Sequence, residues 1–152
     1  MLIKNLVISI EQKIKIRKKL IHELIESLKS DLDFELESLE INIVSQKSIH
    51  ELNKKYLSHD FTTDIITFNY SGENYNLDGE VFVSLEDACE NAVKYKVSLQ
   101  MELTRLIIHG ILHLLGYDDI RENDKKKMKR LENRLVKKYA HFSNYKIVEY
   151  DC

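Results

Sequence analysis

Two histidines one helical turn apart offer a pair of metal ligands. His109 and His113 lie in an apolar run of helical length, and a spacing of four places both imidazoles on one face of a helix. A pair held on a rigid element binds a metal with little further loss of chain entropy. Gly116 follows where the helix would end in a left-handed conformation, and the reversal could carry Asp118 or Asp119 back over the histidines. The pattern therefore predicts two nitrogen ligands, one oxygen ligand and an open fourth position, which is typical of a catalytic metal site.

The histidine segment also has a structural interpretation. A single histidine on an apolar helix is usually a core residue with satisfied hydrogen bonds, but two at this spacing, followed by glycine and an acid, favour a metal site. The arrangement resembles the zincin pattern H-E-x-x-H with a distal third ligand. Position 110 is glycine here, so the glutamate that serves zinc proteases as general base is absent. A protease is therefore disfavoured.

Composition predicts one globular domain spanning residues 1–152. The chain is 43% hydrophobic and 32% charged, with a formal net charge of −2, so nucleic-acid binding would need a local basic patch. Arg105 and His109 interrupt the longest apolar run, and we expect no membrane span. The N-terminus is too interrupted for a secretory signal. Cys89 and Cys152 form no metal or redox motif, so we expect free thiols in a reducing compartment and a cytoplasmic location.

Hydrophobic periodicity predicts an α+β fold. Alternating or β-branched stretches predict four strands, at residues 2–10, 39–44, 64–70 and 79–85. Helices are expected from about Glu11 through Leu28, from Ser48 with a capping box, from a cap near Ser84 to Tyr95, from Ser98 to Leu115, and from about Asn123, whose helix turns Met128, Leu131, Leu135 and Val136 inward. We therefore expect a small mixed sheet of about four strands flanked by helices. The histidine helix, which is apolar nearly all round, should be its central buried helix.

The histidine segment resembles the signature of a known family. H-G-I-L-H-L-L-G-Y-D-D is similar to H-G-x-L-H-L-x-G-Y-D-H of the YbeY family, bacterial single-strand endoribonucleases acting in ribosomal RNA maturation. The stretch Leu52–Phe68 resembles that family's L-N-x-x-Y-R-x-x-D-x-x-T-D-V-L-S-F, and Gly79–Ser84 resembles its G-D-I-x-I-S strand. Met128 and Glu132 match an M-x-x-x-E pattern in its last helix. The resemblance covers residues from about 50 to 135.

The resemblance implies a zinc ion, one per chain, held by His109, His113 and Asp119. Asp119 replaces the third histidine of the pattern, at the interval zincins use for their third ligand, whereas Asp118 is better placed to cap the turn or support a ligand. Leu57 replaces the arginine of the family pattern, and Glu80 replaces an aspartate.

The implied activity is a zinc-dependent, single-strand-specific endoribonuclease. It would act in maturation of the 3′ end of small-subunit ribosomal RNA and in ribosome quality control, with single-stranded RNA, ribosomal RNA and the small ribosomal subunit as partners and no membrane. Zinc held by His109 and His113 would lower the pKa of its bound water toward about 7; attack by a ribose 2′-hydroxyl is the alternative. Lys54, Lys55 and Arg105 are the candidate RNA contacts.

Two other functions remain open from the sequence. A non-catalytic ribosome-associated metalloprotein is favoured by the missing arginine at Leu57 and by the net acidity. A small zinc hydrolase of another substrate class is disfavoured by Gly110. The lysines of 125–130 are interleaved with acids, which is typical of a solvated helix face rather than an RNA patch.

Overall fold

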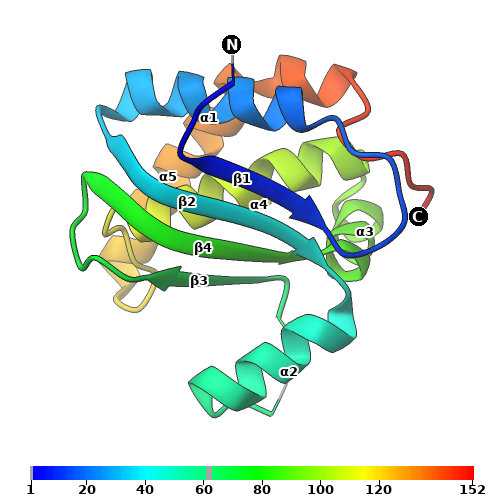
Figure 1. Cartoon of the computed structure of the whole chain (residues 1–152), viewed down its shortest axis with the longest axis horizontal. Helices are drawn as coiled ribbons and strands as arrows, with labels where there is room; N and C mark the ends of the chain where they lie inside the picture. The colour runs from blue at the N-terminus through cyan, green and yellow to red at the C-terminus, as the bar shows by residue number, and fades with distance from the viewer. Residues whose placement is uncertain (1, 61–62) are drawn as a thin grey trace.

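Four strands form one mixed sheet, as predicted (Figure 1). The computed structural model describes residues 2–60 and 63–152. In chain order the elements are β1 (Leu6–Ile10), α1 (Lys18–Leu32), β2 (Glu35–Val44), α2 (Gln46–Leu57), β3 (Ile65–Asn69), β4 (Asn76–Ser84), α3 (Leu85–Tyr95), α4 (Leu99–Leu114), α5 (Glu122–Lys138) and the 3₁₀ helix η1 (Ala140–Asn144). The sheet order is β1-β2-β4-β3. β1, β2 and β4 are parallel, and β3 pairs antiparallel with β4 at the edge.

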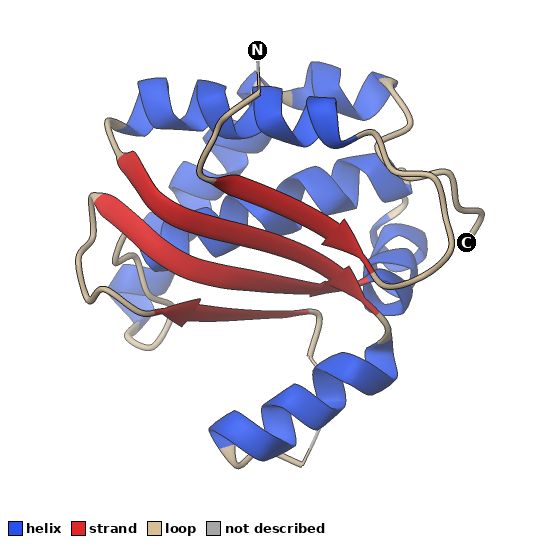
Figure 2. Ribbon diagram, in the orientation of Figure 1, coloured by secondary structure: helices blue, strands red, loops and turns tan. Residues whose placement is uncertain are grey.

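The two faces of the sheet differ. Helices α1, α3, α4 and α5 lie on one side, behind the sheet in Figure 2, and enclose the main core. On the other side α2 packs against one end only, in a small cluster of Val44, Ile49 and Ile66 that Phe68 and Phe82 border. No helix within residues 2–60 and 63–152 covers the rest of that face, and its outward side chains are polar or partly exposed. None of the helices in the described ranges is long and apolar enough to cross a membrane.

Helix α4 is the central buried helix that the sequence predicts. The Ser98 side chain accepts a hydrogen bond from the amide of Met101 at 3.0 Å and caps its start. Its end is closed by Gly116, whose φ is +98°. The amide of Gly116 donates to the carbonyl of His113, and that of Tyr117 donates to Leu112, both at 3.0 Å. The helix is thus fixed at both ends, and the chain turns back directly after the histidines.

Gly110 lets α4 approach the sheet closely. A Cβ atom added there would lie 2.9 Å from Val81 Cγ1 and 3.1 Å from Ile65 Cδ1. Any side chain at this position would push the helix away from β3 and β4. The glycine that argues against a protease is therefore a packing requirement of this fold.

Two helix starts were predicted wrongly. α1 begins at Lys18, not near Glu11. Ile16 belongs to an extended segment that bridges to Val148, so its apolar periodicity reflects packing outside a helix. The N-cap of α2 is Ser45, whose side chain accepts from the amide of Ser48 at 3.1 Å, rather than Ser48 itself.

The other elements follow the predictions with shifted ends. The first strand begins only at Leu6, whereas β2 and β4 extend beyond the predicted stretches. Ser84 caps α3 as predicted, through the amide of Asp87. The loop predicted between α2 and β3 is described except for Phe61 and Thr62, which lie outside the described residues.

The prediction of free thiols is wrong. Cys89 of α3 and Cys152 at the chain end form a disulfide, with Cα atoms 5.3 Å apart and a sequence separation of 63. The C-terminal segment returns to this side of the fold because the side chain of Gln100 hydrogen-bonds both the amide and the carbonyl of Val148. Such a long-range return leaves no signature in cysteine spacing.

Candidate metal centre

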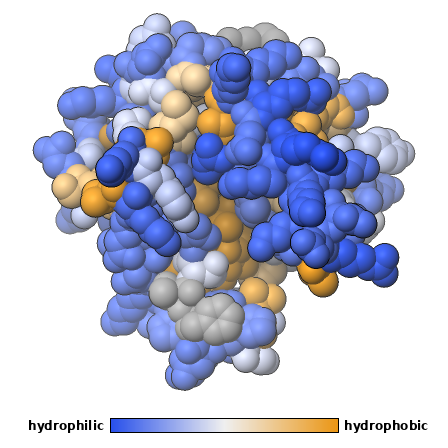
Figure 3. Space-filling model, turned by 180° about the vertical axis from the view of Figure 1, so that it is seen from behind, coloured by the Kyte–Doolittle hydropathy of each residue, from blue (hydrophilic) through white to orange (hydrophobic). Residues whose placement is uncertain are grey.

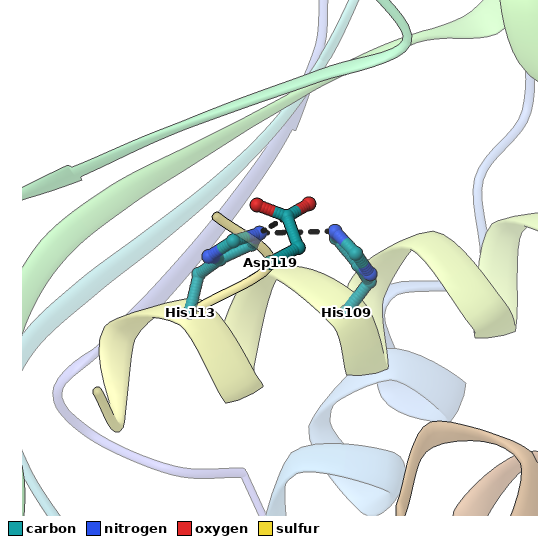
Figure 4. A group of neighbouring side chains, drawn as sticks. All are labelled: His109, His113 and Asp119. Carbon is teal, nitrogen blue, oxygen red and sulfur yellow. Dashed lines mark hydrogen bonds and ion pairs between the residues drawn. The ribbon is translucent and has the colours of Figure 1, made fainter. Parts of the chain in front are cut away.

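Three side chains converge at the end of α4 (Figure 4). His109 and His113 point from successive turns of the helix, and Asp119 comes back over them from the loop after Gly116. The two Nε2 atoms are 3.0 Å apart, and His113 Nε2 lies 3.8 Å from Asp119 Oδ2. Each residue offers one ligand atom, and these atoms all lie within 4.8 Å of one another. The structure thus brings together the three residues that the sequence named as metal ligands.

Glu132 of α5 contacts His109 at Nδ1, the ring nitrogen that does not face the metal centre. Its Oε1 lies 2.5 Å from His109 Nδ1, and its side chain is only 4% exposed. Burial would raise the pKa of Glu132, but the hydrogen bond and charge of His109, together with Lys129, keep it below the ordinary value. A carboxylate at Nδ1 makes that nitrogen the donor, so the Nε2 lone pair of His109 is directed toward the site.

His113 is also prepared as a neutral ligand. Burial is the main cause that lowers its pKa, and the neighbouring charge of His109 acts in the same direction. Asp119 and a backbone hydrogen bond with Tyr117 oppose the shift without reversing it. A neutral imidazole keeps the lone pair that a metal requires.

The donor set fits a borderline transition metal. Two imidazole nitrogens and one carboxylate oxygen are ligands that zinc accepts, and three protein ligands leave one tetrahedral position open. Asp118 is not part of this converging group, and its Oδ1 accepts a hydrogen bond from the amide of Ile120 at 3.2 Å, which supports the turn. His109, His113 and Asp119 are therefore the residues that would hold the ion.

Two cavities meet at this centre. The smaller one, about 290 Å³, wraps around the edge strand and is lined by His113, Leu57, Asn53 and residues of β3. The larger one, about 1190 Å³, extends from His109 and Asp119 between α3 and α5. Figure 3 shows an apolar floor between polar walls on this side of the molecule. Ile65 lines both cavities, so they lie next to each other beside the metal centre.

The candidate RNA contacts have different surroundings. Lys54 and Lys55 are exposed on the last turn of α2. Arg105 is engaged instead: its Nη1 binds Glu132 Oε2 at 3.0 Å and Asn133 Oδ1 at 3.1 Å. Leu57, which stands where the family pattern has arginine, is 41% exposed and lines the smaller cavity with His113. That position therefore faces the site.

Two buried acids near the centre were not predicted as parts of it. Glu132 entered the sequence analysis only through a family pattern, although an acid among Met128, Leu135 and Val136 on the apolar stripe of α5 is a detectable anomaly. Glu102 is 3% exposed, and one amide group of Asn91 donates to both Glu102 and Asp64, at 3.1 and 3.0 Å. Burial is the main cause that raises the pKa of Glu102.

An α+β fold in which two histidines and an aspartate converge with one coordination position open is typical of a metal-dependent hydrolase. A family model described as Endoribonuclease YbeY matches residues 3–140. The chain therefore belongs to the endoribonuclease YbeY family, whose members are hydrolases of phosphodiester bonds in RNA.

Individual relatives agree with this assignment. The chain is 37% identical over 132 residues to a protein of Chlorobium limicola named Endoribonuclease YbeY, covering 84% of this chain and 91% of that protein. A protein of the same name from Amoebophilus asiaticus is 36% identical over 115 residues, which are 76% of this chain and 78% of the relative. The solution structure of a Thermotoga maritima protein superposes with a TM-score of 0.61 at 29% identity, covering 92% and 95% of the two chains.

Proposed function

We propose that this endoribonuclease depends on zinc and cuts single-stranded RNA. The observation that carries the proposal is the convergence of His109, His113 and Asp119, with Glu132 fixing His109, at the meeting point of two cavities. Bound zinc would supply a Lewis acid that activates a nucleophile and stabilises charge on the phosphoryl oxygens. The further assignment to the 3′ end of small-subunit ribosomal RNA and to ribosome quality control rests on the family resemblance. The proposed cytoplasmic location is supported only by an N-terminus that does not resemble a secretory signal, because the two cysteines are not free thiols.

The walls of the larger cavity suit a nucleotide chain. Lys125, Lys126 and Lys129 line it on the α5 side and can meet phosphates, while the exposed side chains of Tyr95 and Val97 provide apolar surface for a base. These lysines were interpreted from sequence as a solvated helix face, and the cavity gives them a second role. A base can enter such a cavity only when it is not paired in a helix, which favours single-stranded substrates.

The buried groups position the ligands rather than react. Arg105 and Lys129 both contact Glu132 Oε2, at 3.0 and 3.3 Å, and so hold the carboxylate that orients His109. The Arg105 guanidinium is thereby already paired with a carboxylate of the protein. Binding of the substrate backbone then depends on exposed lysines, including Lys54 and Lys55 beside the smaller cavity.

A direct test compares cleavage of a 5′-labelled single strand and of the matching duplex. Metal-free protein, protein reconstituted with zinc, and the His113→Ala variant are assayed side by side. We expect zinc-restored cleavage of the single strand only, and none in the variant. A 2′,3′-cyclic phosphate at the product end would identify attack by the 2′-hydroxyl, because attack by water does not produce one.

Leu57 favours a second candidate function, a ribosome-associated metalloprotein that binds RNA without cutting it. An apolar residue lines the smaller cavity at the position of the family arginine, so one expected phosphate contact is missing. Zinc-loaded protein that binds the single strand but leaves it intact would support this candidate and contradict the first. A small zinc hydrolase of another substrate class gains nothing from the structure, because packing excludes a general base at Gly110.

A further inference from the structure

We propose that Tyr56, Phe68 and Tyr70 form a base-stacking strip for single-stranded RNA on the outer face of edge strand β3. This inference rests on the proposed function, because it extends the path of the RNA away from the metal centre. The strip is not part of either cavity, and the mechanism above does not use it.

The three rings are contiguous and come from two elements. Phe68 and Tyr70 are two residues apart at the end of β3 and project to the same side. Their ring centroids are 6.3 Å apart with an angle of 5° between the planes. Tyr56 at the end of α2 meets Phe68 edge to face at 5.8 Å. Phe82 of β4 supports Phe68 from the side, at 5.9 Å and 85°.

Packing does not account for the outer two rings. Tyr56 is 57% exposed and Tyr70 is 60% exposed, while Phe68 is half-buried against the small cluster under α2. Exposed single aromatics are ordinary, but adjacent exposed rings on a rigid strand form a surface that water solvates poorly. Such a surface suits a flat apolar ligand.

The orientation of Tyr70 is fixed before any ligand binds. Its hydroxyl donates to Glu80 Oε1 at 2.8 Å. This hydrogen bond is the main cause that raises the pKa of Tyr70 to about 12, so the phenol stays neutral. A ring held in place loses little conformational entropy when a base stacks on it.

Cations at the Tyr56 end and continuity with the smaller cavity favour RNA as the ligand, while the carboxylates of Glu80 and Glu40 act on Tyr70 at the other end. Lys55 Nζ lies 5.1 Å from the centroid of Tyr56, and Lys54 is its exposed neighbour, so cations for phosphates stand beside the first ring. Leu57 directly follows Tyr56, and Ile66 lies two residues before Phe68 on the same face of β3; both line the smaller cavity together with His113. A strand whose phosphate reaches the metal centre can therefore leave through this cavity and place its next bases on the strip. Stacking accepts every base, so the strip adds affinity without sequence preference.

The test measures binding of a 2′-O-methyl oligonucleotide of about eight nucleotides, which cannot use 2′-hydroxyl attack. Fluorescence anisotropy gives the Kd for the zinc-loaded wild type and for Tyr56→Leu and Tyr70→Leu. Each substitution is expected to weaken binding about 5- to 100-fold. Tyr70→Phe keeps the ring and should stay close to the wild type. Tyr145→Leu, which removes a 53% exposed tyrosine after η1, is the matched control.

The outcomes separate this inference from the proposed function. Tyrosine-dependent binding of the 2′-O-methyl oligonucleotide, together with no cleavage of unmodified single-stranded RNA by the zinc-loaded wild type, would support the strip and contradict the nuclease. Cleavage with unchanged Kd in both leucine variants would overturn the strip and leave the nuclease intact. Equal weakening by Tyr145→Leu would also overturn it, because the effect would then follow from exposed tyrosines in general.

Discussion

Two polar clusters in this protein each consist of a carboxylate bonded to an aromatic or imidazole side chain and to a lysine. They differ in whether their hydrogen bonds stay within the cluster or lead on to the metal centre. Between α1 and α5, Asp31 Oδ2 accepts from the Tyr139 hydroxyl at 2.8 Å and from Lys138 Nζ at 2.9 Å. At the metal centre, Glu132 contacts His109 Nδ1 and two cations. In the first, closed cluster, the Tyr139 and Lys138 groups that bond Asp31 do not lead on to the metal centre. The second continues through His109 to an Nε2 atom that faces another Nε2 atom at 3.0 Å.

The difference indicates what each cluster is for. With Glu132 at Nδ1 of His109, the Nε2 atom of His109 faces His113 Nε2, and Asp119 lies beside them, so the atoms at this end form a group that a metal ion could join. A closed cluster joins two helices and contributes to stability. The open cluster at the metal centre contributes less to stability, because its ligand atoms are left available for a metal ion.

The largest expected effect comes from removing a ligand of the open cluster. His113→Ala should fold but bind less than one metal ion per chain, because only His109 and Asp119 remain. Cleavage of single-stranded RNA should be lost. Metal analysis of the purified variant measures this, with thermal unfolding as a control for the fold. Full metal occupancy would show that the centre does not use His113.

The two aspartates after the turn should differ in their effect on metal affinity. Asp119→Ala removes a ligand atom and should weaken binding by more than the 10–100-fold typical of supporting groups. Asp118→Ala removes only the acceptor for the amide of Ile120 and should have less effect. Zinc competition against a chromogenic chelator compares them. Retention by the Asp119 variant with release by the Asp118 variant would reverse the ligand assignment.

Weakening the contact between Glu132 of α5 and His109 should reduce metal affinity by an intermediate amount. Glu132→Gln keeps the shape and an acceptor for His109 Nδ1 but loses the charge, so metal affinity should fall about 10–100-fold. Glu102→Gln is the matched control, since Glu102 is equally buried at 3% but has no hydrogen bond to either histidine among the described residues. Equal losses in both variants would mean that buried charge in general, not contact with His109, sets the affinity.

The closed cluster should affect stability and not the metal. Asp31→Asn is expected to cost about 1 kcal/mol of unfolding free energy at pH 7, because charge-assisted hydrogen bonds contribute modestly at a partly exposed site. Metal affinity should not change. Glu26→Gln, an exposed acid on the same helix, should alter stability by less than about 0.5 kcal/mol.

The stabilisation by Asp31 should depend on pH, in a direction set by the shift of its pKa. Hydrogen bonds from Lys138 and then Tyr139 hold the pKa of Asp31 below its ordinary value. The stabilisation is therefore complete above the unfolded-state pKa of about 4 and is lost as the pH falls through the folded-state pKa. Urea unfolding of wild type and Asp31→Asn should converge below about pH 4. A constant difference down to pH 2 would contradict this account.

Local signals in the sequence were sufficient for most of the fold and for naming the three residues that converge at the candidate metal centre. The i, i+4 histidines, the caps at Ser84 and Ser98, and Gly116 each act within one or two turns of chain, so their spacing specifies their geometry. Ile16 was misassigned because its partner, Val148, lies far along the chain. The cysteine pair and the contact between His109 and Glu132 are long-range in the same way. Tyr56 and Tyr70 carry no periodic signal, since only the folded sheet brings them together.

The disulfide makes a covalent ring of the functional half of the molecule. Residues 89–152 contain both histidines, Asp119 and Glu132, and Cys89 is bonded to Cys152. A protease that cuts the exposed loop after α4 would therefore leave two fragments joined, and they would separate in electrophoresis only after reduction. The residues of the metal centre would thus stay covalently linked after a break in the backbone between two of its own ligands.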